Sequence, residues 1–250
     1  MSLKGMAAVI GVAERAPQRY SGDLTVLDLI SGVAVEAMED AGVDRSEVDG
    51  LLVHPVGGLP GFVPATVAEY LGLRPTFAEL VDLGGATGAG MIWRAAAAIQ
   101  AGMCTTCLCV TGSRRRASRP SRPAVEEEPQ RPRSIQPKRD RSPAAEFDLP
   151  YGMIGANVGY AMIATRYTHE YGLGDEQRAK VAVDQRRNAN ANPSAIFHDQ
   201  PLTIDDVLAS EMICEPLRML EIVMPAAGAA ALLVTSADRA NDARQPPAWL

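Results

Sequence analysis

The sequence predicts an α/β protein in which helices pack on a largely parallel sheet. Short β-rich segments alternate with segments whose apolar residues recur at helical spacing, an order typical of βαβ units. Hydrophobic residues make up 47% of the 250-residue chain, which is enough for a large buried core. Aromatic residues account for only 5%, whereas Ala, Gly and Val are frequent, so we expect the helices to lie close to the sheet.

Four strands and three helices are predicted in the first 112 residues. Glycines and prolines mark the turns between them, and Gly42 follows the first helix as its C-cap. The predicted elements are a strand at 6–13, a helix at 24–41, a strand at 49–55, a helix at 62–72, a strand at 76–83, a helix that starts in the segment GGATGAG at 84–90, and a strand at 107–112.

Residues 113–143 differ sharply in composition from the rest of the chain. They contain ten Lys or Arg residues against four acidic ones, with many Pro and Ser and almost no apolar residues. Such a segment cannot bury enough surface to offset the entropy lost on ordering, so we expect an exposed, mobile insert. Its arginines suit a phosphate-bearing ligand, and the alternative is a solvated insertion without a ligand.

Helical periodicity returns after the insert, at 153–171 and at 175–191. A short helix follows at 203–209, with Thr203 as its N-cap. Residues 226–240 begin as a strand of small residues and continue as a polar helix start or loop. The final PAWL has a strand pattern for which we expect no partner within this chain.

Composition and charge exclude several classes of protein. The formal net charge is −6, and charged residues make up 22%, which is ordinary for a globular protein and argues against a general nucleic-acid binder. No run of eighteen apolar residues is present, and the first residues have no signal-peptide pattern. We therefore expect no membrane span and a cytoplasmic location.

The four cysteines are Cys104, Cys107, Cys109 and Cys214. The C-x-x-C-x-C spacing of the first three suggests a metal site, with Cys214 as the fourth ligand. The segment MCTTCLCVTG, however, has the pattern of a buried strand in which Cys107 and Cys109 share one face. We expect buried structural thiols and no metal.

Four blocks of the sequence resemble the thiolase superfamily, in particular its sterol-carrier-protein-x type. They are GGATGAGMIWRAAAAIQAGMC, YGLGDEQRAKVAVDQRRNANANPSA, TIDDVLASEMICEPLRMLE and AAGAAALLVTSADRA, and they follow the order of the family. The resemblance implies a thiolase-like fold, with a βαβαβαβ half of the N-terminal core and a helical loop domain over the acyl-CoA site. It also implies that the C-terminal half is absent from this chain, because the GHP histidine and the second cysteine of that half are missing.

The resemblance sets the expected domain boundaries. Residues 1–112 correspond to the first part of the N-terminal core, and residues 113–225 to the loop domain with the basic insert at 113–143. Residues 226–250 correspond to the last N-terminal core strand and the start of the link to the missing half. In the family the strand equivalent to 76–83 lies at the sheet edge and pairs with its twofold mate, so we expect at least a homodimer.

The position of the family's nucleophilic cysteine is occupied by glycine. In the family this cysteine lies in a C-A-S-G turn at the start of a buried helix, whose dipole favours the thiolate. The turn corresponds to Gly85-Ala86-Thr87-Gly88, so Gly85 replaces the cysteine. The hydroxyl of Thr87 has no adjacent base, and we expect it to cap the helix rather than to attack a substrate. Backbone N–H groups from Gly84 to Gly88 still suit the binding of an oxyanion.

A second departure from the family concerns a methionine motif, M-G-x-T-A-E-N, which lines the acyl pocket ahead of a Y-G-[IL] turn. Counting back from that turn at Tyr171 places Tyr160 at the methionine position. A phenol there can bind a substrate oxygen or exchange a proton in a retro-aldol step, and the alternative is a tyrosine that packs under the loop domain. Thiolase-fold enzymes without the cysteine resemble this pattern. They act as aldolases on β-hydroxyacyl-CoA and pair with a small OB-fold, zinc-binding subunit.

His54 ends the second predicted strand beside a Gly/Pro turn, where parallel sheets gather the residues of a site. We keep it as a candidate for substrate binding, against the alternative of a packed or hydrogen-bonded histidine. The other two histidines, His169 and His198, are expected at the surface.

These features lead to one primary hypothesis and two alternatives. The primary hypothesis is an acyl-CoA-binding protein of the acyltransferase superfamily that breaks a carbon–carbon bond in a β-hydroxyacyl- or β-ketoacyl-CoA, with no tightly bound cofactor. Gly85 to Gly88 would bind the oxyanion and Tyr160 would exchange the proton. One alternative is a non-catalytic scaffold subunit or an inactive fragment. The other is a classical thiolase whose cysteine comes from elsewhere, and the glycine at position 85 counts heavily against it.

Overall fold

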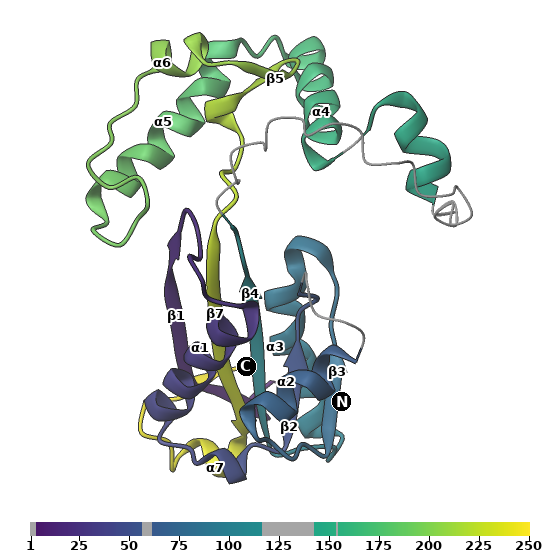
Figure 1. The fold of residues 1–250 in the computed structure, drawn as a ribbon, viewed down its shortest axis with the longest axis vertical. Coiled ribbons are helices and arrows are strands. Elements are labelled where there is room, and N and C mark those ends of the chain that lie inside the picture. The colour runs from purple at the N-terminus through teal and green to yellow at the C-terminus, as the bar shows by residue number, and fades with distance from the viewer. Residues whose placement is uncertain (1–3, 57–61, 117–142, 154) are drawn as a thin grey trace, which may run out of the picture. The chain divides into compact units, whose positions relative to one another are not determined.

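The computed structural model describes residues 4–56, 62–116, 143–153 and 155–250 of the chain (Figure 1). The chain divides into two compact units. The first unit comprises Met1–Ala117 and Pro225–Leu250, and the second comprises Ser118–Met224. Most of the predicted basic insert, residues 117–142, lies outside the described residues.

The first unit is built on one six-stranded sheet. Its strands are β1 (Ala7–Gln18), β2 (Gly50–Val53), β3 (Phe77–Leu80), β4 (Thr106–Ser113), β7 (Ala227–Ser236) and β8 (Ala248–Trp249). Their order across the sheet is β3-β2-β4-β7-β1-β8. Pairing is mixed rather than largely parallel: β2 is parallel to β3 and β4, whereas β7 is antiparallel to β4 and β1, and β8 is antiparallel to β1.

The mixed pairing follows from the position of β7 in the sheet. This strand follows the second unit in the chain and inserts between β1 and β4, pairing with both along most of its length. The C-terminal strand β8 shows that the expectation for PAWL was wrong. Trp249 pairs with Ala8 of β1, and the Leu250 N–H donates to the Ala7 carbonyl at 3.0 Å.

Helices cover both faces of this sheet (Figure 1). They are α1 (Val26–Ala41), α2 (Val63–Leu71), α3 (Thr87–Gln100) and α7 (Ala237–Ala240), with single 3-10 turns η1 (Arg45–Glu47) and η2 (Gly84–Ala86). One hydrophobic core joins α1 and α2 to the sheet through residues such as Leu29 and Leu233. A second core joins α3 to the opposite face through residues such as Met91 and Val234. The three helices predicted between the first four strands are confirmed.

Gly11 marks the closest approach of α1 to the sheet. A Cβ at this position would lie 2.5 Å from the Ala37 carbonyl oxygen and 2.7 Å from the Ala41 Cβ. The small residues predicted to allow close packing therefore allow contact between the backbone of β1 and that of α1.

The second unit is mainly helical. Its helices and turns are a π-helical turn η3 (Ala144–Asp148), the 3-10 turn η4 (Leu149–Tyr151), α4 (Ala156–Tyr171), α5 (Asp175–Ala191), α6 (Ile204–Ala209) and the 3-10 turn η5 (Met219–Glu221), and its strands are β5 (Met212–Cys214) and β6 (Leu217–Arg218). Thr203 caps α6 as predicted, since its hydroxyl accepts the Asp206 N–H at 3.1 Å. The β5–β6 hairpin was not predicted. No helix in the described ranges is both long enough and apolar enough to cross a membrane.

Arg178 ties the hairpin region to α5. Its Nε donates to the Glu221 carboxylate at 2.6 Å, and one of its terminal nitrogens donates to the Pro216 carbonyl at 2.9 Å. The side chains of Arg178 and Glu221 are only 12% and 4% exposed. This ion pair is therefore largely removed from solvent, unlike the exposed Lys180–Asp184 pair on the same helix.

Candidate functional site

The turn Gly84–Gly88 leads from the segment after β3 into α3. Gly84 has a φ of +56°, a left-handed conformation that favours glycine, and its N–H donates to the Asp82 carboxylate at 3.1 Å. Ala86 is the N-cap residue of α3, and its methyl group cannot cap the helix. The Ala86 N–H donates to the Leu83 carbonyl at 3.2 Å, and the Thr87 N–H donates to the Gly84 carbonyl. The expectation that every N–H from Gly84 to Gly88 is available to an oxyanion is therefore wrong for Gly84, Ala86 and Thr87, and a negatively charged oxygen can bind only through the other N–H groups at the start of α3.

Gly85 occupies an open position in this turn. A Cβ built on Gly85 would meet no atom of the described residues within 4 Å, and the same is true at Gly84 and Gly88. Gly85 is also outside the left-handed conformation that Gly84 adopts. Within the described structure, neither packing nor backbone conformation requires glycine at position 85, and its absent side chain leaves free space beside the N-terminus of α3.

Thr87 is a structural residue of the turn. It is 2% exposed, and its hydroxyl donates to the Gly84 carbonyl at 2.7 Å while it accepts the Leu83 N–H at 2.9 Å. Both bonds reach back into the turn, so Thr87 does not serve as the N-cap that the sequence suggested. A hydroxyl held on both sides and buried in this way is poorly placed to attack a substrate.

His54 follows β2 at the end of the sheet where the turn lies. Its N–H donates to the Val110 carbonyl at 3.1 Å, and the pairing of Val53 with Leu80 brings it beside the segment that leads to Gly84. The imidazole is half-buried, and its Nδ1 is buried without a hydrogen-bond partner among the described residues. Buried nitrogens are normally paired, so His54 stays a candidate for contact with a substrate.

Tyr160 lies on α4, in the second unit. It is 65% exposed, and Ile163, Tyr167 and Tyr171 follow it along the same side of the helix, because residues three, four and seven apart share a helical face. The rings of Tyr167 and Tyr171 are 4.6 Å apart. The aromatic face of α4, defined by Tyr160, Ile163, Tyr167 and Tyr171, is thus uncovered within the second unit.

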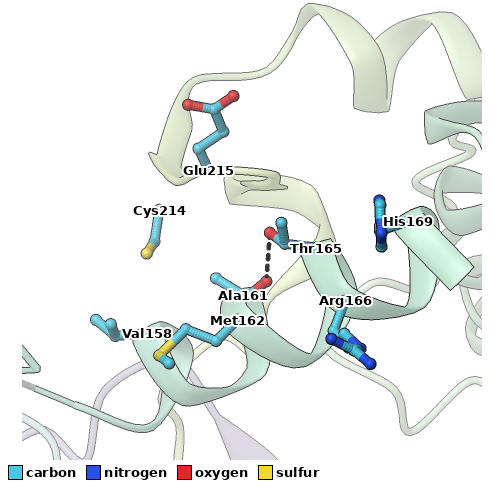
Figure 2. Close-up of a pocket in the computed structure, with 8 residues that line it drawn as sticks. All are labelled: Val158, Ala161, Met162, Thr165, Arg166, His169, Cys214 and Glu215. Carbon is cyan, nitrogen blue, oxygen red and sulfur yellow. Dashed lines mark hydrogen bonds between the residues drawn. The ribbon is translucent and has the colours of Figure 1, made fainter.

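A groove of about 450 Å³ lies on the other side of α4, against β5 (Figure 2). Figure 2 shows Val158 and Cys214 at one end and Arg166 and His169 at the other. Val158 and Met162 lie opposite Tyr160 on the helix, since successive residues are about 100° apart. Sequence reasoning missed this groove because it did not predict the β5–β6 hairpin. The lining residues are Val158, Ala161, Met162, Thr165, Arg166, His169, Cys214 and Glu215.

The cysteines of β4 are structural. Cys107 and Cys109 pack in the core beneath α3, on one face of the strand as predicted, and Cys104 is buried beside them. The hydrogen bond with Cys107 and burial raise the pKa of the Cys104 thiol far above its ordinary value. A thiol in that state is a poor nucleophile and a poor metal ligand. In the described ranges, no group of three or more His, Cys, Asp or Glu side chains is placed to hold a metal ion.

Comparison with known proteins matches residues 9–238 to the N-terminal domain of thiolase. A steroid side-chain-cleaving aldolase of Thermomonospora curvata is 32% identical over 254 residues, which is 99% of this chain and 61% of the aldolase. A 17-hydroxy-3-oxo-4-pregnene-20-carboxyl-CoA lyase of Mycobacterium tuberculosis is 29% identical over 98% of this chain and 61% of the lyase. The solved Ltp2-ChsH2(DUF35) aldolase has a TM-score of 0.82 at 30% identity, over 100% of this chain and 60% of that chain.

These matches confirm the predicted fold class, a mixed α/β thiolase-like domain. The chain spans 61% of the length of each of the two relatives.

Proposed function

The chain belongs to the thiolase family, and from this premise we propose that it forms part of a carbon–carbon lyase that cleaves a β-hydroxyacyl-CoA by a retro-aldol reaction. The names of the aldolase and the lyase that it resembles suggest a steroid acyl group as the substrate. Within the family, we propose the sterol-carrier-protein-x type, which four blocks of the sequence resemble.

The observation that carries this proposal is the turn Gly84–Gly88. Acyl transfer through a covalent intermediate needs a nucleophile, but Gly85 has no side chain and the Thr87 hydroxyl is bonded on both sides. Although the turn has no nucleophile, it still provides the N-terminus of α3 and free space beside Gly85. Such a turn suits stabilisation of an oxyanion in a reaction that does not pass through an acyl-enzyme.

A retro-aldol reaction makes limited demands on the protein. A base removes the proton of the β-hydroxyl, the bond between Cα and Cβ breaks, and Cβ leaves as a carbonyl. The electron pair of that bond passes to the thioester as an enolate, which then takes up a proton. We assign the N-terminus of α3 in the turn Gly84–Gly88, through its backbone N–H groups other than those of Gly84, Ala86 and Thr87, to the enolate oxygen. Tyr160 is assigned to the proton transfer, and His54 is a further contact for a substrate oxygen. Acyl-CoA is the substrate, and the proposal includes no tightly bound cofactor.

The proposal also includes partners. The solved aldolase is described as Ltp2-ChsH2(DUF35), and we propose that this chain also binds a second subunit of the ChsH2(DUF35) kind. The family resemblance implies that this subunit is a small OB-fold protein that binds zinc. We further propose a homodimer through β3, whose outer edge is unpaired in the described sheet and adjoins a groove with the 60% exposed Trp93. Sedimentation at micromolar concentration tests the dimer, and a stable monomer would contradict it. The four free cysteines fit the cytoplasmic location that we propose.

Replacement of Tyr160 by Phe tests the chemistry. The assay is cleavage of a β-hydroxyacyl-CoA by the full-length protein with its partner subunit. Loss of the phenol alone should lower kcat by about 100-fold or more, since proton-transfer groups contribute about 100- to 10,000-fold. Tyr167→Phe is the matched control, because Tyr167 also lies on the aromatic face of α4, and its kcat should stay near wild type. A loss below about threefold for Tyr160→Phe, far under that range, would reduce Tyr160 to a packing residue.

A non-catalytic subunit that binds acyl-CoA and supports an active partner is the second candidate function. The turn itself favours it, because Gly85 and Thr87 supply no reactive side chain. Stoichiometric binding of acyl-CoA by an assembled protein that turns over no substrate would support this candidate over the lyase. Intact-mass measurement after incubation with acyl-CoA should show no adduct for either function, and an adduct on Thr87 would contradict both.

A further inference from the structure

Five arginines gather at one end of the sheet in the first unit. The register of both ladders brings the carboxyl ends of β1 and β4 to the same end of β7 (Figure 1). Two of the arginines lie on or just after β1, and three follow β4 directly. They are Arg15, Arg19, Arg114, Arg115 and Arg116, named here the arginine cluster.

Arg115 holds the two chain segments of this cluster together. Its backbone carbonyl accepts hydrogen bonds from the Ser21 N–H at 2.8 Å and from the Ser21 hydroxyl at 3.0 Å. Its guanidinium lies 5.2 Å from the centre of the Tyr20 ring and donates to the Pro225 carbonyl. The segment after β1 is thus fixed against the segment after β4 through Tyr20, Ser21 and Arg115.

The positive charge of the cluster is not neutralised locally. No member forms an ion pair with a carboxylate of the described residues, although the chain as a whole carries a net charge of −6. The positive charge of Arg114 contributes to the lowered pKa of the Asp28 carboxyl. The oxygens of that carboxylate already have partners, however, since Oδ2 is engaged in the capping box of α1 and Oδ1 accepts from the Tyr70 hydroxyl. The Nε of Arg114 is buried and has no hydrogen-bond partner among the described residues.

The cluster lies at the same end of the sheet as the turn Gly84–Gly88. Strands β3, β2 and β4 are parallel neighbours, so the turn after β3 and the arginines after β4 both follow carboxyl ends. Two strand spacings, about 10 Å, separate β3 from β4. In α/β sheets ligands bind in this position, outside the carboxyl ends of the strands.

We propose that the arginine cluster binds the phosphate groups of the CoA moiety while the thioester lies at the turn Gly84–Gly88. Arginine matches the geometry and charge of phosphate through paired N–H donors. The pantetheine arm of CoA separates the thioester from the phosphates, which fits two sites at one end of the same sheet. This inference rests on the proposed function, because that function supplies the ligand.

Binding measurements with three probes test the cluster. Dissociation constants of CoA, pantetheine and inorganic tripolyphosphate are measured for wild type, Arg19→Gln, Arg114→Gln and the control Arg74→Gln. Arg74 is exposed and precedes β3, at the opposite end of the sheet. Arg19 is exposed, so its replacement leaves the fold intact. We expect CoA binding to weaken about tenfold in each cluster variant, with pantetheine binding unchanged and Arg74→Gln like wild type.

Each other outcome overturns one of the proposals. Equal CoA affinity in Arg19→Gln, Arg114→Gln and Arg74→Gln would contradict the site. Tripolyphosphate binding that needs the arginines, without CoA binding, would assign the cluster to another phosphate source and overturn the CoA assignment. Arginine-dependent CoA binding in a protein that cleaves no β-hydroxyacyl-CoA would support the cluster and contradict the lyase, so the two proposals can fail separately.

Discussion

The two units of the chain are stabilised in different ways. In the first unit helices bury apolar side chains on both faces of the sheet, and Leu51, Leu108 and Leu233 are inaccessible to solvent. In the second unit α4 buries only Ala161 and α5 only Ala179. A few polar contacts fix its hairpin instead. The comparison indicates that buried apolar side chains stabilise the first unit, whereas ion pairs and helix caps stabilise much of the second.

The largest loss of stability is expected for a substitution at Gly11, where β1 and α1 are packed too closely to admit a side chain. Gly11→Ala would place a methyl group 2.5 Å from the Ala37 carbonyl oxygen and 2.7 Å from the Ala41 Cβ, and neither can move without shifting α1. We expect the free energy of unfolding to fall by about 3 kcal/mol or more. Urea unfolding followed by circular dichroism measures this change.

Gly32→Ala is the matched control for Gly11→Ala. Gly32 lies within α1, and a Cβ there meets no atom of the described residues within 4 Å. Alanine is the better helix former by about 0.5–1 kcal/mol, so this variant should be as stable as wild type or slightly more stable. A Gly11→Ala protein with the stability of Gly32→Ala would show that α1 does not rest on β1 as described.

The first unit could be predicted well from sequence because burial leaves a periodic pattern. Helix α1 was predicted at 24–41 and is found at Val26–Ala41, with Gly42 as its left-handed C-cap. The strand order could not be predicted in the same way. Nothing in the local pattern of AAGAAALLVTS states that β7 inserts between β1 and β4, because its pairing joins residues more than a hundred positions apart.

The second-largest loss of stability is expected when Arg178, in the second unit, is replaced. Arg178→Ala would leave the nearly buried Glu221 carboxylate without its partner and free the Pro216 carbonyl. We expect a local loss of about 2 kcal/mol, because the partner charge is stranded in a poorly hydrated position. Faster amide hydrogen exchange in residues 204–221, with unchanged exchange in the sheet of the first unit, would be the signature.

Lys180→Ala provides the contrast on the same helix. The Lys180–Asp184 pair is exposed, and such pairs contribute about 0.5 kcal/mol or less. Equal exchange profiles for Arg178→Ala and Lys180→Ala would contradict the view that one buried pair holds the hairpin region.

The site was predicted in part. The residues at the turn could be named from sequence, because the glycine-rich pattern before a helix is local. The hydrogen bonds of Thr87 could not, since its hydroxyl reaches back to Leu83 and Gly84 only when the turn is folded. The groove beside β5 was missed because β5 has three residues and β6 two, too few for a periodic pattern.

A third prediction restores a nucleophile in the first unit and compares it with an ordinary helix position in the second. Gly85→Cys has space for its side chain and lies at the N-terminus of α3. We expect its thiol pKa to fall about one unit below the free value of about 8.5, because the helix end stabilises the thiolate. The rate of alkylation against pH reports this pKa.

The experiment is done in a Cys214→Ala background, because Cys214 is the one cysteine of the four that is not buried. Val181→Cys is the reference, since Val181 is 59% exposed in the middle of α5, away from either helix end. A pKa for the cysteine at 85 equal to or above that at 181 would show that residue 85 lies outside the field of α3.

The smallest effect concerns two capping boxes of the same design. Thr25 and Asp28 cap α1 in the first unit, and Thr203 and Asp206 cap α6 in the second. Hydrogen bonds from the threonine side chain and backbone lower the pKa of both aspartates. Because the folded pKa is lowered, each carboxylate stabilises its helix above the ordinary value of about 3.9, and this contribution is lost as pH falls through the lowered pKa.

Loss of the capping box should affect α6 more than α1, because the two helices differ in how many residues they bury. Helix α1 buries eight residues against the sheet, whereas α6 has six residues and buries only Val207. Acidification from about pH 6 through the lowered pKa of Asp206, which lies below the ordinary value of about 3.9, should therefore reduce the protection factors of the α6 amides while those of α1 stay high. Asp206→Asn should remove the pH dependence of the protection factors in α6, and Asp28→Asn should leave it unchanged. Loss of protection in α1 and α6 at the same pH would mean that burial does not protect the first unit more than the second.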